Sequence, residues 1–268
     1  MIGLFDSGVG GLTVLREVAR QLPDYSLLYL GDTARTPYGN KSDEVVAAYG
    51  LQAARFLVER GAKIMVVACN TVSAVGLPAI RQAYPDIPLF DVITPAVEAI
   101  VRNPRLAGKQ EKSRRIGVMG TRALVGSGIY QKLLSEKNDY EVICQAAPLL
   151  VPLVEEGWLD RPETKRIIKR YLTPFKQAQV DTLVLACTHY PLLKAIITPR
   201  LGRRVKIIDP AEETAAALAK WLGEHPAEAV NLSKSESHFC VTDLTPQTVA
   251  IASHWLRRKI KLEKVTLR

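Results

Sequence analysis

Short runs of apolar residues alternate with longer amphipathic stretches along almost the whole chain. The run at residues 64–68 is apolar throughout, which is typical of a parallel strand covered by helices on both faces. Alternating strands and helices predict an α/β fold with mostly parallel sheets. The expected strands are 2–5, 27–30, 64–68, 89–92, 116–119, 140–145, 183–186, 205–208, 238–242 and, more weakly, 260–265. The expected helices are 12–21, 43–59, 72–84, 96–102, 124–137, 164–177, 192–201, 211–222 and 246–256.

The pattern of one half of the chain recurs in the other half. Val-Ala-Cys-Asn-Thr at residues 67–71 corresponds to Leu-Ala-Cys-Thr-His at residues 185–189. Each cysteine is followed 22 positions later by an aspartate that ends another apolar run, Asp91 or Asp209. Such self-similarity indicates an internal duplication. Two similar halves that face each other can present one thiol from each side of a cleft.

The duplication predicts two pseudo-symmetric α/β domains with the active site in the cleft between them. The repeat lengths assign residues 1–93 and 210–268 to a discontinuous first domain and residues 94–209 to the second. Each unit then falls near the usual domain size of about 100–150 residues. A polar and basic loop at residues 103–115 lies near the expected boundary.

Composition and charge narrow the possible classes of protein. The chain has 268 residues, of which 24% are charged and 47% hydrophobic, as in an ordinary globular protein. Its net charge of +9 leaves a basic binding protein open as an alternative. The sequence has neither an RNA-binding aromatic signature nor a paired-cysteine zinc finger, so we expect no nucleic-acid partner. No apolar stretch approaches the ~18 residues of a membrane span, so we expect no membrane partner. The first residues show no signal-peptide pattern, which predicts a cytoplasmic protein with free thiols.

Polar residues gather where the expected strands end. In open α/β sheets, ligands bind at the carboxyl ends of the strands. The groups at these ends are Asp6-Ser7-Gly8, Asp32-Thr33, Cys69-Asn70-Thr71, Gly120-Thr121 and Cys187-Thr188-His189. They come from distant parts of the chain but fall at one structural level, so the sequence predicts a site there.

The two cysteines are the strongest candidates for catalysis. We expect each to lie at a helix N-terminus, which lowers the pKa of a thiol from its usual value of about 8.5 toward the range of a general base. Asp6 can orient or deprotonate one thiol, and His189 can serve the other. Hydroxyl and amide groups beside helix N-termini can bind an anion such as an α-carboxylate. The candidates for that role are Ser7, Asn70, Thr71 and Thr188.

Several competing sites fit the sequence poorly. The segment Gly8-Val9-Gly10-Gly11 lacks the spacing of a dinucleotide-binding loop, and there is no Walker A loop or nucleophile elbow. Zinc binding by Cys187 and His189, as in a zinc hydrolase, stays an alternative, but no C-x-x-C pair completes a structural site. We therefore expect no metal.

Taken together, these segments resemble the aspartate/glutamate racemase family over most of the chain. One departure is Ala186, where the family has glycine before the second cysteine. The motifs that carry the resemblance are Phe5-Asp6-Ser7-Gly8-Val9-Gly10-Gly11-Leu12, Gly31-Asp32-Thr33, Pro37-Tyr38-Gly39, Ala68-Cys69-Asn70-Thr71, Gly120-Thr121 with Ser127 and Tyr130, Val151-Pro152-Leu153-Val154-Glu155, and Cys187-Thr188-His189-Tyr190-Pro191-Leu192.

The resemblance implies cofactor-free interconversion of L- and D-glutamate, supplying D-glutamate for bacterial peptidoglycan. It implies that Cys69 and Cys187 are the acid/base residues and that Asp6, Glu155 and His189 assist them. It also implies a homodimer. His189 in place of glutamate favours glutamate over aspartate as substrate, although a racemase of another amino acid such as aspartate stays open. The implied substrate contacts are Asp6, Ser7, Tyr38, Gly39, Asn70, Thr71, Thr121, Thr188 and His189.

Overall fold

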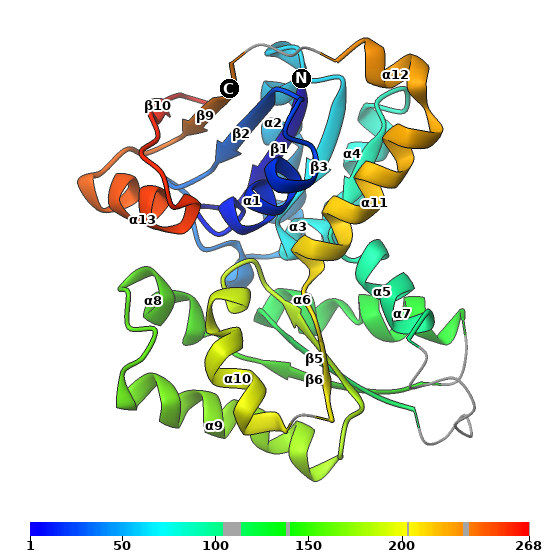
Figure 1. Cartoon of the computed structure of the whole chain (residues 1–268), viewed down its shortest axis with the longest axis vertical. Helices are drawn as coiled ribbons and strands as arrows, with labels where there is room; N and C mark the ends of the chain where they lie inside the picture. Colours follow the sequence, from blue (N-terminus) through cyan, green and yellow to red (C-terminus); the bar gives the residue numbers. More distant parts are fainter. Residues whose placement is uncertain (104–113, 138–139, 203, 233–235, 268) are drawn as a thin grey trace.

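The computed structural model describes residues 1–103, 114–137, 140–202, 204–232 and 236–267. Over these ranges the chain forms two sheets of parallel strands with helices around them (Figure 1). The predicted α/β class with two similar halves is therefore confirmed. Most of the predicted boundary loop, residues 104–113, lies outside the described residues. None of the helices in the described part of the chain is long and apolar enough to cross a membrane.

The first sheet has the strand order β10-β9-β2-β1-β3-β4. The central strand β1 pairs with β2 on one side and with β3 on the other, all in parallel. The central strands β1, β2 and β3 are fully buried, which explains why their sequences are almost entirely apolar. The bounds of the strands are β1 Ile2–Asp6, β2 Leu27–Gly31, β3 Ile64–Val67, β4 Leu89–Asp91, β9 His238–Val241 and β10 Glu263–Lys264.

The second sheet repeats the core of the first, with the order β6-β5-β7-β8. Its central strand β5 pairs with β6 and β7 as β1 pairs with β2 and β3, and Gly117 of β5 faces Leu183 as Gly3 of β1 faces Met65. The strand that precedes each cysteine is thus equivalent in the two sheets. The bounds are β5 Arg115–Gly120, β6 Glu141–Ala146, β7 Thr182–Ala186 and β8 Lys206–Ile208.

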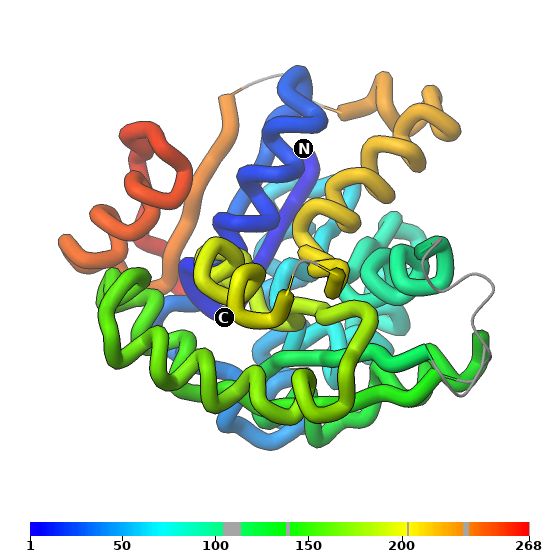
Figure 2. Tube along the Cα trace, turned by 60° about the horizontal axis from the view of Figure 1, so that its bottom comes forward, coloured from blue at the N-terminus to red at the C-terminus, as the bar shows by residue number. Residues whose placement is uncertain are grey.

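Helices follow most of the strands and cover the sheets. Figure 2 shows α11 running beside α1, and these two helices share many contacts. The bounds are α1 Leu12–Gln21, α2 Asp43–Glu59, α3 Asn70–Val75, α4 Leu77–Ala83, α5 Thr94–Val101, α6 Arg122–Ser127, α7 Ile129–Ser135, α8 Leu150–Glu155, α9 Pro162–Gln177, α10 Lys194–Leu201, α11 Pro210–Glu224, α12 Pro226–Val230 and α13 Pro246–Leu256, with 3-10 turns η1 Tyr38–Asn40 and η3 Tyr190–Leu193.

Two of the predicted helices are each broken by a glycine. The stretch 72–84 divides into α3 and α4 around Gly76, and 124–137 divides into α6 and α7 at Gly128. Gly128 has a φ of 64°, a left-handed conformation that glycine adopts without a steric penalty. The short helices α8 and α12 were not among the predicted elements because their apolar patterns span barely two turns.

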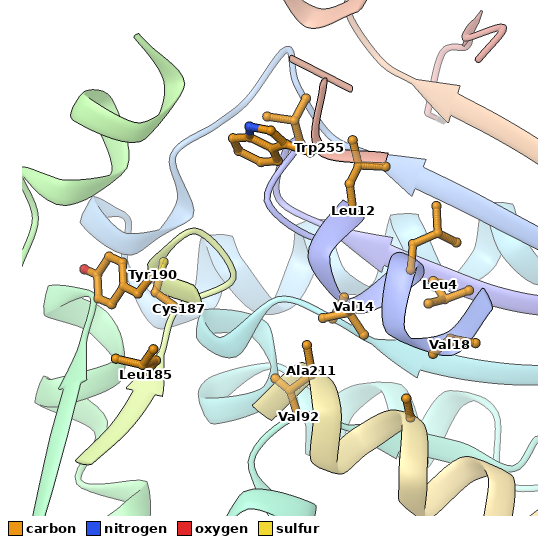
Figure 3. Close-up of a cluster of buried hydrophobic side chains, with 14 of the residues drawn as sticks. Leu4, Leu12, Val14, Val18, Val92, Leu185, Cys187, Tyr190, Ala211 and Trp255 are labelled. Carbon is orange, nitrogen blue, oxygen red and sulfur yellow. The ribbon is translucent and has the colours of Figure 1, made fainter. Parts of the chain in front are cut away.

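One hydrophobic cluster contains residues of both sheets and their helices. Figure 3 shows Leu4 and Val14 from the first sheet's side, and Leu185 and Tyr190 from the second sheet's side. After β8 the chain adds β9 and β10 to the first sheet. The domain boundaries at residues 93 and 210 stay a prediction.

Candidate active site

Residues from both halves line one small cavity of about 30 Å³. Cys69 follows β3 of the first sheet and Cys187 follows β7 of the second, so equivalent strand ends bring the two thiols to the same space. The predicted site residues Ser7, Tyr38, Gly39, Asn70, Thr71, Thr121, Thr188 and His189 also line this cavity, together with Thr36, Pro37 and Val151. Asp6 and Glu155 are not among the residues that line it.

Cys69 is buried and occupies the N-cap position of α3. Burial, and to a lesser extent the nearby Asp6 carboxylate, raise the pKa of its thiol to about 12, although a hydrogen bond from Ser7 opposes the shift. The predicted lowering of this pKa by the helix N-terminus was wrong, because α3 has only six residues and desolvation outweighs its dipole. In the structure Cys69 is therefore a protonated thiol at neutral pH.

Asp6 ends β1 and is 1% exposed. Its Oδ2 accepts a hydrogen bond from the backbone N–H of Gly8 at 3.1 Å. Its Oδ1 is buried and has no partner among the described residues. Burial raises the pKa of Asp6, while the positive charge of His189 partly opposes the shift. Asp6 is thus a buried acceptor with unused capacity beside Cys69.

Cys187 follows β7 but does not begin an α-helix, so its predicted position at a helix N-terminus was wrong. A tight turn closes there, in which the N–H of Tyr190 donates to the carbonyl of Cys187 at 3.0 Å, and η3 follows. The turn places His189 so that its Nδ1 lies 3.9 Å from the Cys187 Sγ. The partner of this thiol is therefore an imidazole rather than a helix end.

His189 connects Cys187 to Glu155. Its Nε2 donates a hydrogen bond to Oε1 of Glu155 at 2.9 Å. Burial alone would lower the pKa of His189, but its hydrogen bonds to Cys187 and Glu155 and their negative charges raise it to about 10. The ring of Trp255, on α13, meets the imidazole edge to face with centroids 5.6 Å apart. At neutral pH His189 is therefore an imidazolium held between Cys187 and Glu155.

Two glycines allow the halves to approach closely at the cavity, and only Gly39 was predicted as a site residue. A Cβ on Gly10 would overlap Thr188 Oγ1 and would lie 2.5 Å from His189 Cε1. A Cβ on Gly39 would lie 2.6 Å from Thr121 Cβ. In both cases a glycine of the first half faces the second half. The cluster Gly8–Gly11 was the signal for this role, although the sequence alone gives it no partner.

Polar contacts complete the wall of the cavity. The hydroxyl of Tyr38 donates to Oδ2 of the fully buried Asp32. The hydroxyls of Thr71 and Thr121 hydrogen-bond to each other at 3.0 Å across the two halves. Oδ1 of Asn70 is buried and, among the described residues, unpartnered. Asn70 and Asp6 therefore offer two buried acceptors to any ligand that carries N–H groups.

A larger cavity of about 210 Å³ lies outside the first. Glu155 and Glu156 of the α8 segment line it, and Arg122 donates to Oδ1 of Asn40 at 3.3 Å on its rim. We name this space the outer cavity and the smaller one the inner cavity. The wall common to both is formed by Thr36, Pro37, Gly39, Thr121 and Val151.

The described residues contain no group of three or more His, Cys, Asp or Glu arranged to hold a metal ion. The donors at the inner cavity instead form two separate pairs. One is Cys69 with Asp6 and the other is Cys187 with His189. Acid/base chemistry on a small polar molecule fits this donor set.

Comparison with known proteins relates the chain to amino-acid racemases. The Asp/Glu/hydantoin racemase family matches residues 2–218. Glutamate racemase of Geobacter metallireducens is 43% identical over 260 residues, covering 97% of this chain and 93% of the relative. The glutamate racemase RacE1 of Bacillus anthracis superposes with a TM-score of 0.91 at 38% identity, covering 100% of this chain and 97% of that structure. The Francisella tularensis glutamate racemase, solved in complex with D-glutamate, gives a TM-score of 0.90 at 32% identity, covering 99% and 97%. The chain therefore belongs to the Asp/Glu/hydantoin racemase family.

Proposed function

We propose that this protein interconverts L- and D-glutamate without a cofactor, using Cys69 and Cys187 as the two acid/base groups. The observation that carries the proposal is the single inner cavity lined by both thiols, each from an equivalent strand of its half. The similarity to glutamate racemases over nearly the full chain supports glutamate rather than aspartate as the substrate.

The reaction needs one group to remove the α-proton and another to deliver a proton to the opposite face. Cys187, whose Sγ lies 3.9 Å from Nδ1 of His189, suits the first task, and the protonated thiol of Cys69 suits the second. In the reverse direction the two thiols exchange roles. By the family's pattern we expect Cys187 to act on L-glutamate and Cys69 on D-glutamate.

The α-proton of an amino acid is weakly acidic, so the site must stabilise the negative charge that develops near the α-carboxylate. The hydroxyls of Ser7, Thr71 and Thr188 and the amide of Asn70 line the inner cavity and can donate to this carboxylate. The unpartnered oxygens of Asp6 and Asn70 can accept from the substrate ammonium group. Because the cavity is closely surrounded by protein, these interactions gain strength from the exclusion of water.

In this proposal the product D-glutamate serves peptidoglycan synthesis, as the family resemblance implies. Location in the cytoplasm and assembly as a homodimer stay predictions of the sequence.

The test is a chiral assay with purified protein, L-glutamate and no added cofactor. We expect D-glutamate to accumulate until the enantiomers are equal, while L-aspartate stays unchanged under the same conditions. Conversion of aspartate in place of glutamate would favour the aspartate alternative. Absence of conversion for either amino acid would contradict the proposal.

A further inference from the structure

Three spaces follow one another between the protein surface and the two thiols. A wide surface depression of about 530 Å³ shares Gly39, Asn40 and Arg122 with the outer cavity. The outer cavity in turn shares the wall described above with the inner cavity. Asn40 and Arg122 are exposed, whereas Cys69 and Cys187 are buried. The three spaces therefore form a series that leads from solvent to the thiols.

The outer cavity is large enough for the substrate, although the inner cavity is not. Its 210 Å³ correspond to roughly ten water molecules, which is about the number of non-hydrogen atoms in glutamate. The inner cavity has only about 30 Å³. A glutamate molecule can therefore occupy the outer cavity before the wall common to both cavities opens.

The outer cavity has few charged groups. Glu155 accepts from Nε2 of the His189 imidazolium at 2.9 Å, so its charge is already paired. Among the described residues that line this cavity, Arg122 is the only cation. Arg122 donates to the neutral side chain of Asn40 at 3.3 Å and forms no ion pair within the described part of the chain. Glu156 is exposed and is likewise free of an ion pair there.

The start of helix α6 places Arg122 at the entrance. Oγ1 of Thr121 accepts from the N–H of Leu124 at 3.2 Å, so Thr121 is the N-cap and Arg122 is the first helical residue. A cation in the first turn opposes the helix dipole, so helix stability does not account for an arginine at this position. Lys41 and Asp43 also line the surface depression, but their charges are opposite. Arg122 therefore sets the sign of the charge where the depression meets the outer cavity.

We infer that glutamate enters through the outer cavity and that the positive charge of Arg122 captures it there. The inference rests on the proposed racemase function and adds an entry route and a capture residue to it. At neutral pH glutamate carries two carboxylates and one ammonium group, so it is an anion. A guanidinium offers a carboxylate two parallel N–H donors, and a positive field at a cleft raises the local concentration of an anionic substrate.

This role separates binding from chemistry. Arg122 does not line the inner cavity, where the two thiols meet the substrate. Its charge therefore stabilises the bound substrate and the transition state about equally, which affects KM and leaves kcat unchanged. Because Arg122 is exposed, dissolved salt screens its field, and the effect should weaken as ionic strength rises.

The experiment compares Arg122→Gln with the wild-type enzyme in both reaction directions. At an ionic strength of about 20 mM we expect KM for L- and D-glutamate to rise about threefold to tenfold, with kcat within about twofold. At about 0.5 M salt the Debye length falls to about 4 Å, and the difference in KM should shrink below about twofold. Initial rates are measured by chiral chromatography, and circular dichroism checks the folding of each variant.

Three further variants separate the charge of Arg122 from its contact with Asn40 and from the net charge of the protein. Arg122→Lys keeps the charge and should keep KM within about twofold of the wild-type value. Glu156→Gln removes a negative charge from the same cavity, so it should lower KM for the anionic substrate. Arg166→Gln is the matched control, because Arg166 is exposed on α9 and lines none of the three spaces. It makes the same change in net charge and should leave kcat and KM near those of the wild type.

Several outcomes would overturn the capture role. A rise in KM for Arg122→Gln that does not change with salt, or that Arg122→Lys shares in full, would indicate a structural contact instead. An unchanged KM for Arg122→Gln, an equal rise for Arg166→Gln, or a raised KM for Glu156→Gln would also contradict it. Should Arg122→Gln misfold, the Arg122→Lys and Glu156→Gln variants and the salt dependence of the wild-type KM still test the inference. Absence of racemisation by the wild-type enzyme would contradict the proposed function itself.

Discussion

The two thiols of the inner cavity lie at equivalent strand ends but in different electrostatic surroundings. Cys69 lies beside the buried Asp6, and its pKa is raised to about 12. Cys187 lies beside His189, whose own pKa is raised to about 10. One half of a duplicated fold thus places a carboxylate beside its thiol, and the other half places an imidazole there.

This difference suits a reaction between mirror images. A base and an acid must face each other at the start of each turnover, and identical surroundings would favour the same protonation state for both thiols. The two enantiomers have equal free energies, so kcat/KM must be the same in both directions. The asymmetry of the site can therefore appear only in kcat and KM separately, in isotope exchange and in thiol reactivity.

Removal of either thiol should have the largest effect on activity. We expect Cys69→Ser and Cys187→Ser each to lower kcat/KM by about 10²–10⁴-fold, because a serine hydroxyl is a far poorer base at neutral pH. Chiral chromatography of both reaction directions measures the loss. As a control, Cys144→Ser changes a thiol outside the inner cavity and should leave the rate near that of wild type. Near-normal racemisation by either active-site variant would refute the two-thiol mechanism.

The rate of alkylation measures the difference in reactivity between the two thiols. At pH 7–9 we expect iodoacetamide to modify Cys187 faster than Cys69 by on the order of tenfold to a hundredfold, because only thiolates react and the raised pKa of Cys69 keeps it protonated. Peptide mapping by mass spectrometry follows each site. His189→Asn should remove most of the difference by removing the imidazolium. Faster modification of Cys69 would contradict the raised pKa of that thiol.

Gly10 tests how tightly the Cys187 side is held. A Cβ there would overlap Thr188 Oγ1 and press on His189, so Gly10→Ala should lower kcat/KM roughly tenfold to a hundredfold by displacing the imidazole. Steady-state kinetics with circular dichroism measure activity and folding together. Gly126→Ala is the matched control, since a Cβ meets nothing within 4 Å at that helical position. Equal activities of the two variants would show that the close approach at Gly10 does not matter.

Asp91 and Asp209 occupy equivalent positions in the two halves, so their surroundings can be compared as those of the thiols are. Asp91 accepts from the N–H groups of Ile93 and Thr94, whereas Asp209 accepts from that of Ala211. Burial raises the pKa of Asp209 to about 6 from its usual value near 4, so its ionisation opposes folding as pH rises through that interval. Asp209→Asn keeps an acceptor for the cap and should stabilise the protein by about 1–2 kcal/mol at pH 8.

Denaturant melts at pH 4, 6 and 8 check this last prediction. The stabilisation by Asp209→Asn should be small at pH 4 and largest at pH 8, because Asp209 is ionised only above its folded pKa. Asp209→Ala is the control that removes the cap, at a cost of about 1 kcal/mol. A stabilisation by Asp209→Asn that does not change with pH would contradict the assigned burial effect.

The strand pattern and the duplication could be predicted from the sequence because buried parallel strands are apolar at every position. The shared cavity of Cys69 and Cys187 follows from the same pattern, since equivalent strand ends lie at equivalent places. The state of the thiols could not be predicted, because desolvation depends on what the rest of the chain packs around each sulfur. The contacts of Gly10 and Trp255 with His189 could not be predicted for a related reason, because they join residues that are far apart in the sequence.

The breaks at Gly76 and Gly128 show a limit of local pattern. Apolar spacing continued through both glycines, but the backbone ends a helix at each and starts another. The role of Glu155 had only family resemblance to support it, since two turns of helix give too little periodicity to orient a side chain.

The inner cavity, at about 30 Å³, has room for about one or two water molecules and not for an amino acid. Substrate arrival and product departure therefore require the surrounding walls to move apart and return in every cycle. Such motion is hindered by solvent friction. A viscous medium therefore slows turnover when the motion of the walls, rather than bond breaking, is the slow step. The tight fit that excludes water from the reacting carbon thus makes the turnover rate depend partly on how fast the cavity opens and closes.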